Sequence, residues 1–93
     1  MHIGTHYVVY YEGIFGRVRS SRKIDTFEEA CDRFERFRDG DYQATVFRVE
    51  PPLPQGCKCG ICIDVTADAE ERIRNRYRQR RGYEMPAWLR EVA

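Results

Sequence analysis

The first twenty residues carry the pattern of a β-hairpin. Residues 6–11 and 14–20 are rich in β-branched and aromatic side chains, and Glu12-Gly13 between them has the composition of a two-residue loop. That loop predicts three cross-strand pairs on one face: Tyr7 with Val18, Val9 with Gly16 and Tyr11 with Ile14. The opposite face would then carry Val8, Tyr10, Phe15, Arg17 and Arg19.

Residues 27–38 carry the spacing of an amphipathic helix. Thr26 followed by Glu29 has the form of a capping box, and Asp39-Gly40 is a suitable end. The apolar stripe consists of Phe27, Ala30, Cys31, Phe34 and Phe37. We expect this stripe to cover the hairpin.

The rest of the chain predicts two further strands and a second helix. Tyr42–Glu50 alternates as a strand does, and a proline-rich run at 51–54 ends it. A short strand is expected at 61–65. Asp68 with Glu71 then predicts a capping box and a helix over about 69–81, ended by Gly82. Residues 86–92 would add a short helix anchored by Trp88 and Leu89.

These elements predict an α+β domain with a small antiparallel sheet in β-β-α-β-(β)-α order. Ninety-three residues make a single domain, 1–93, in which 51–60 is a Pro/Cys-rich crossing between residues 6–50 and 61–93. Because both faces of the sheet have apolar members, we expect the first helix on one face and the C-terminal half at least partly on the other.

Charge and composition narrow the classes of function. Sixteen basic and fifteen acidic residues give a net charge of +1, so any electrostatic function must come from local patterning. The start of the chain lacks a signal-peptide pattern, and no run approaches 18 apolar residues. We expect a cytoplasmic protein with no membrane contact.

One local pattern is the run 72–81, which holds six arginines. That density is typical of a helix that contacts nucleic acid. The alternative is a helix whose arginine stems cover apolar surface and whose guanidinium groups pair with Glu70, Glu71 or acidic residues of the first helix.

A second pattern combines aromatic and basic residues on one predicted sheet face: Tyr10, Phe15, Arg17, Arg19 and Arg48. Such a face is similar to a stacking platform for single-stranded bases. The alternative is that Tyr10 and Phe15 are buried beneath the C-terminal helix and Trp88.

Three cysteines, Cys57, Cys59 and Cys62, fall within six residues. With Cys31 or His6 as a fourth ligand they would make a structural zinc site. The alternatives are buried thiols without a cofactor and, less in keeping with the β-type residues after Cys62, a redox pair formed with Cys59. The expected cofactor is therefore none, or one structural zinc.

Catalytic patterns do not emerge from the sequence. Histidines stand only at 2 and 6, and no glycine-rich phosphate loop or spacing of nucleophile, base and orienting group is present. We expect a binding protein and not an enzyme.

The aromatic hairpin, the segment Thr26–Phe34 on a helix and the strand at 43–50 resemble small phage and mobile-element accessory proteins of the anti-CRISPR type. The resemblance implies a non-catalytic inhibitor that docks on a host protein or ribonucleoprotein complex, in the host-cell cytoplasm if the chain is phage-encoded. On this hypothesis the contact surface is the helix and its rim: Arg72, Arg74, Arg76, Tyr77, Arg78, Arg81 and Trp88. The alternatives are a nucleic-acid-binding module that uses the same helix and a zinc-stabilised structural subunit.

Overall fold

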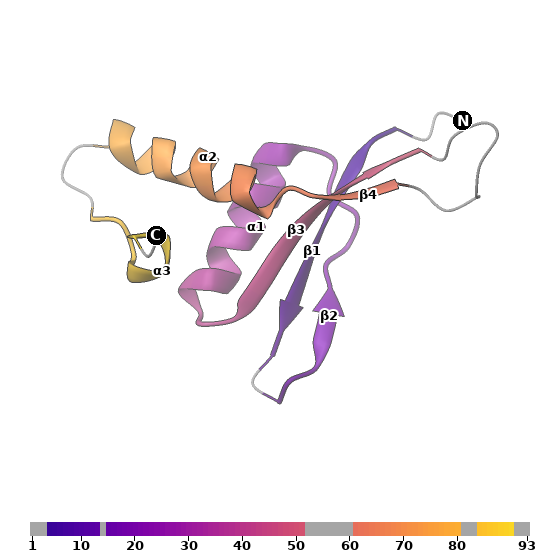
Figure 1. The fold of residues 1–93 in the computed structure, drawn as a ribbon, viewed down its shortest axis with the longest axis horizontal. Helices are drawn as coiled ribbons and strands as arrows, with labels where there is room; N and C mark the ends of the chain where they lie inside the picture. The colour runs from indigo at the N-terminus through magenta and orange to yellow at the C-terminus, as the bar shows by residue number, and fades with distance from the viewer. Residues whose placement is uncertain (1–3, 14, 52–60, 81–83, 91–93) are drawn as a thin grey trace.

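A computed structural model describes residues 4–13, 15–51, 61–80 and 84–90. Its elements follow the chain in the order β1 (His6–Glu12), β2 (Val18–Ser20), α1 (Phe27–Asp39), β3 (Gln43–Glu50), β4 (Ile61–Asp64), α2 (Thr66–Gln79) and α3 (Ala87–Arg90) (Figure 1). The four strands form one antiparallel sheet. The predicted α+β class and order of elements are thereby confirmed.

The two longest strands lie at the centre of the sheet. The strand order is β2-β1-β3-β4, and β1 pairs with β3 along its whole length, from His6 opposite Val49 to Glu12 opposite Gln43. The edge strand β2 covers only one end of β1, whereas β4 covers the other end of β3. The β1–β3 pair therefore fixes which side chains share a face.

The hairpin exists, but its predicted two-residue loop is wrong. β2 pairs with β1 from Tyr10 opposite Ser20 to Glu12 opposite Val18, so residues 13–17 form the connection. The Gly13 amide donates to the Arg17 carbonyl at 3.0 Å, and Gly16 adopts φ +75°, a conformation that glycine accepts without strain. The predicted pairs with Ile14, Gly16 and Val18 are incorrect, although Ile14 itself lies outside the described residues.

Both long helices contribute to one core on one face of the sheet. Val9 and Val46, from β1 and β3, are fully buried with residues of α1, α2 and α3. The helical members of this core are Ala30, Cys31, Phe34, Ala69, Ile73 and Leu89. The expectation that the C-terminal half covers the opposite face is therefore wrong, because α2 packs beside α1 and not across the sheet.

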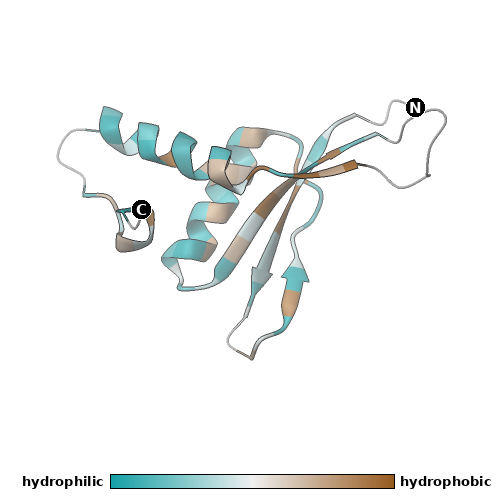
Figure 2. Ribbon diagram, viewed as in Figure 1, coloured by the Kyte–Doolittle hydropathy of each residue, from teal (hydrophilic) through white to brown (hydrophobic). Residues whose placement is uncertain are grey.

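The second face of the sheet is left uncovered by the helices that the structure describes. Paired side chains on this open face include Val8 with Phe47 and Tyr10 with Thr45, and the Tyr10 and Phe47 rings meet edge to face at 5.4 Å. Figure 2 shows hydrophobic colour gathered along the central strands, in contrast to the mostly hydrophilic α2. Tyr10 is 39% exposed, so its predicted burial beneath the C-terminal helix does not occur.

The helix boundaries follow different local signals at the two N-termini. At α1 the predicted cap is present, because the Glu29 amide donates to Thr26 Oγ1 at 3.2 Å. The predicted cap at Asp68 is wrong, since α2 already begins at Thr66. Thr66 Oγ1 accepts the Val46 amide of β3 at 3.0 Å, and Asp64 accepts the Thr66 amide at 2.9 Å. These two hydrogen bonds hold Thr66 against β3 and β4, so the helix begins at Thr66 and not near the predicted cap at Asp68.

In the described part of the chain, no helix is long and apolar enough to cross a membrane. The predicted 51–60 crossing falls largely, and Gly82 entirely, outside the described residues. Of the helix predicted over 86–92, the described residues show Ala87–Arg90 as helical, and residues 91 and 92 lie outside them.

Two phenylalanine-to-alanine substitutions should separate core packing from surface exposure. Phe34→Ala removes a ring that is 1% exposed and should lower the free energy of unfolding by roughly 3–5 kcal/mol. Phe15→Ala removes a ring that is 92% exposed and should change it by less than about 0.5 kcal/mol. Urea unfolding measures both values. Equal losses in the two variants would contradict the described core.

Candidate binding site at the hairpin

Two arginines of the arginine-rich helix α2 form ion pairs with acidic residues of α1. Arg76 donates to Glu28 at 2.6 Å and to Asp32 at 2.7 Å, and Arg72 also pairs with Glu28. Tyr77 donates its hydroxyl hydrogen to Glu35 at 3.0 Å. An acidic stripe on α1 thus holds a basic stripe on α2.

The remaining described members of the predicted contact surface are also engaged within the chain. Arg74 and Arg78 both pair with Glu71, at 3.1 and 3.2 Å. Trp88 donates from Nε1 to Asp39 at 2.9 Å and packs edge to face on Phe34. Arg81 lies outside the described residues. Arg74 and Arg78 thus pair with Glu71 within α2, whereas Trp88 joins α3 to α1. The role of these side chains in binding a partner stays a prediction.

The ion pairs between the helices shift the ionisation of one acid. The hydrogen bond from Arg76, reinforced by the charge of Arg72, lowers the pKa of Glu28 below its ordinary value of 4.5. Both arginines bind the carboxylate form of Glu28. The stabilisation that these ion pairs give the folded state therefore requires Glu28 to be ionised.

A different set of cations is left without such partners. Between Glu12 and Asp25 the chain holds four cations and no acidic residue: Arg17, Arg19, Arg22 and Lys23. All four are exposed, and within the described part of the chain none of their side chains forms an ion pair or a hydrogen bond. We call these four side chains, Arg17, Arg19, Arg22 and Lys23, the basic strip. It runs along the edge of the sheet through β2.

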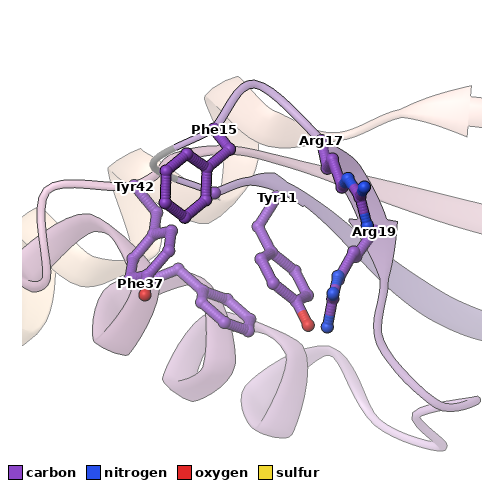
Figure 3. A pocket seen from close by; sticks show the side chains of 7 residues that line it. Tyr11, Phe15, Arg17, Arg19, Phe37 and Tyr42 are labelled. Atoms are coloured by element: carbon purple, nitrogen blue, oxygen red, sulfur yellow. The ribbon is translucent and has the colours of Figure 1, made fainter.

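Beside the basic strip lies an open pocket of about 430 Å3. Its side chains come from β1, the hairpin connection, β2, α1 and the turn before β3: Tyr11, Phe15, Arg17, Arg19, Phe37 and Tyr42. Figure 3 shows the two arginines on one side of Tyr11, with Phe15 and Tyr42 on the other. We call it the hairpin pocket.

Three aromatic rings that pack against one another form the floor of the hairpin pocket. Tyr11 of β1 stacks on Phe37 of α1, with ring centroids 4.0 Å apart and planes 14° apart. Tyr42 stands nearly perpendicular to both rings. Gly40 allows this arrangement, because a Cβ there would stand 3.3 Å from the Tyr42 ring. Strand, helix and turn therefore position these three rings together.

Phe15 differs from these rings in having no packing role. It is 92% exposed, and in the described structure it forms no close aromatic pair. Burying a phenylalanine ring ordinarily stabilises a protein, so an exposed ring next to arginines is a feature of binding surfaces.

The structure divides the predicted nucleic-acid face. Phe15, Arg17 and Arg19 come together in the hairpin pocket, but Tyr10 lies on the open face of the sheet. Arg48 is opposite Tyr7, toward the other end of β1, and its Nε lies 3.2 Å from Glu50. The prediction that all five residues share one face is wrong, because the five-residue connection reverses the side of the sheet on which Arg19 lies.

Sequence reasoning missed Tyr11, Phe37 and Tyr42 as pocket residues. The sequence pattern places Tyr11 and Phe37 on the faces where helix and hairpin meet, which indicates packing but not a cavity. The signal that was present is Gly16, because a second glycine three residues after Gly13 is typical of a longer hairpin connection. The longer connection places Arg19 opposite Tyr11 and hence beside the pocket.

The cysteines do not form a metal centre in the part of the chain that is described. No group of three metal-binding side chains occurs there, and Cys57 and Cys59 lie outside it. Cys31 is fully buried on the inner side of α1, and burial raises the pKa of its thiol to about 11. Cys62 is exposed and opposite Val49 on the open face, with His6 across the same valine. Cys31 is thus on the opposite side of the sheet from Cys62, which argues against it as a fourth ligand.

Comparisons with known proteins add no family to this description. A scan against protein-family models finds no match, and searches of curated proteins and of solved structures find no significant similarity. The chemistry of the hairpin pocket and the basic strip is therefore the guide to function.

Removing Arg76 should lower stability in a pH-dependent way. Because the ion pairs are partly exposed to solvent, we expect Arg76→Ala to reduce the free energy of unfolding at pH 7 by about 1 kcal/mol. The folded-state pKa of Glu28 is lowered, so the contribution is present above about pH 4.5 and is lost as pH falls through the folded pKa. Urea unfolding across pH 3–7 measures the difference.

Arg80→Ala is the matched control, because Arg80 is exposed and has no ion pair in the described structure. We expect it to change stability by less than about 0.5 kcal/mol. A loss for Arg76→Ala that stays constant down to pH 3 would contradict the role of the paired carboxylates.

Proposed function

We propose that this protein is a non-catalytic nucleic-acid-binding module whose contact surface is the hairpin pocket together with the basic strip. The observation that carries the proposal is that Arg17 and Arg19, without partners among the described residues, stand beside the exposed ring of Phe15. Arginine donors bind phosphate in a bidentate manner, and aromatic rings stack with bases.

The distribution of charge supports the choice of this surface over α2. Four arginines of α2 have an acidic neighbour, Glu28, Asp32 or Glu71, at hydrogen-bond distance: Arg72, Arg74, Arg76 and Arg78. A phosphate approaching α2 would meet these carboxylates as well. The basic strip has no acidic residue within its own segment of the sequence, and its four cations form no ion pair in the described structure, although Glu12 lies opposite Val18 on the neighbouring strand.

The composition of the hairpin pocket supports binding without catalysis. The pocket is lined by arginine, tyrosine, phenylalanine and glycine, and no carboxylate, histidine or thiol of the described residues lines it. Such a lining can stack, donate hydrogen bonds and neutralise charge, but it supplies no general base near neutral pH. We place this proposed binding function in the cytoplasm.

A second candidate is the inhibitor suggested by the resemblance to anti-CRISPR proteins. The open face of the sheet favours it, because Val18 is 67% exposed and Tyr10 39% exposed beside Val8 and Phe47. In this case the open face of the sheet would bind an apolar surface of a host nucleic-acid-handling protein. A structural zinc held by Cys57, Cys59 and Cys62 is compatible with either function, and metal analysis of the purified protein tests it separately.

Removal of two arginines from the basic strip should weaken oligonucleotide binding. We expect Arg17→Ala with Arg19→Ala to lower affinity for a single-stranded oligonucleotide about tenfold or more at 50 mM salt. The slope of log affinity against log salt should fall by about 0.7 for each phosphate that the variant no longer neutralises. Fluorescence anisotropy over a salt series measures both quantities.

The control is Arg78→Ala with Arg80→Ala, which changes net charge equally but lies at the C-terminal end of α2. Binding that falls as much in this control as in the strip variant would show that net charge alone is responsible. No oligonucleotide binding by the unaltered protein at low salt would remove the proposed function and leave the inhibitor as the better candidate.

A further inference from the structure

Resting on the proposed function, we infer that the hairpin pocket receives one unstacked base of a single-stranded nucleic acid, while Arg17 and Arg19 bind the phosphates beside that base. The ligand class is therefore single-stranded DNA or RNA and not duplex. Four properties of the pocket support this assignment: its stacking surface, its space, its phosphate-binding groups and its exclusion of a paired base.

Phe15 provides the stacking surface. Its ring is 92% exposed and stands across the hairpin pocket from the two arginines (Figure 3). Every base has an aromatic face, so a ring in this position binds bases with little dependence on sequence. The buried rings of the core cannot serve in this way, because their faces already contact other side chains.

The floor of the pocket suits the edge of a base. Tyr11 and Tyr42 present hydroxyl groups that, within the described structure, form no hydrogen bond with another protein group. A hydroxyl both donates and accepts, so it can pair with any base edge. The volume of about 430 Å3 falls within the range of small-molecule sites and accommodates one base.

The two arginines are spaced for consecutive phosphates. Residues two apart in an extended chain are separated by about 6.8 Å and point to the same side, and both side chains line the pocket. This separation is close to that of neighbouring phosphates in an extended single strand. Arg22 and Lys23 continue the basic strip beyond Arg19, so the strip fits a polyanion better than it fits the single phosphate of a phosphotyrosyl peptide.

A paired base cannot reach this position. Within a duplex each base is stacked and hydrogen-bonded, and extruding it costs a few kcal/mol. In a single strand the bases splay out at little cost, which is why single-stranded segments are the usual targets of aromatic pockets. The concave pocket should therefore discriminate against duplexes, although the basic strip contacts phosphates of either form.

The test uses the full chain and a twelve-nucleotide single strand that contains one 2-aminopurine, a base whose fluorescence is quenched when it stacks. We expect the unaltered protein to quench the probe and to bind the single strand at least tenfold more tightly than the matched duplex. Phe15→Ala and Phe15→Leu should weaken single-strand binding by about 5- to 150-fold, with loss of quenching and an unchanged salt slope.

Val18→Ala is the matched control, since Val18 is also an exposed apolar residue of the hairpin but lies opposite Glu12 on the other face. It should bind as the unaltered protein does. Duplex binding as tight as single-strand binding, or full affinity in Phe15→Ala, would overturn the inference while leaving the proposed function in place. Tighter binding of a phosphotyrosyl peptide than of the oligonucleotide would also overturn it, and no binding of any oligonucleotide would remove both.

Discussion

The rest of the structure depends on the antiparallel pairing of β1 with β3. Seven consecutive pairs lock the two strands together, so Val9 and Val46 must point to the same face. Because those two valines are buried together with α1 and α2, the pairing decides where both helices pack. It also decides that Val8, Tyr10 and Phe47 face the other way. One register thus creates both the core and the open face.

A second constraint is electrostatic and concerns how two helices can share one side of so small a sheet. α2 has few apolar residues with which to pack, and Ala69 and Ile73 are its fully buried members. Arg76 and Tyr77 add polar contacts to Glu28, Asp32 and Glu35 on α1. Ion pairs at this exposure are individually weak, but several converging on one arginine fix the orientation of α2. A near-neutral protein can therefore contain a basic strip, because three acidic residues of α1, Glu28, Asp32 and Glu35, are paired with side chains of α2.

The sequence was sufficient to predict the class, the order of elements and most boundaries, because periodicity and the cap at Thr26 are local signals. It was insufficient wherever a long-range contact decided the outcome. Thr66 starts α2 because the Val46 amide, twenty residues away, requires an acceptor. The six arginines of 72–81 have the same pattern whether they face solvent, phosphate or the acids of α1, and only the packing of α2 distinguishes these cases. Likewise, one difference in loop length transferred Arg17 and Arg19 to the face of Tyr11 and separated them from Tyr10.

The residues of the hairpin pocket divide into those that stabilise the fold and those that we propose to bind a ligand. Tyr11 and Phe37 connect β1 to α1 through their stacked rings, so the floor of the pocket belongs to the fold and is preorganised. Phe15, Arg17 and Arg19 stand on a short connection and an edge strand, and they contribute little packing to the folded state. Substitutions at these three positions are therefore free to alter affinity without cost to the core. The proposed binding surface thus combines a preorganised floor with exposed side chains that the core does not require, an arrangement that a domain with one small core can maintain.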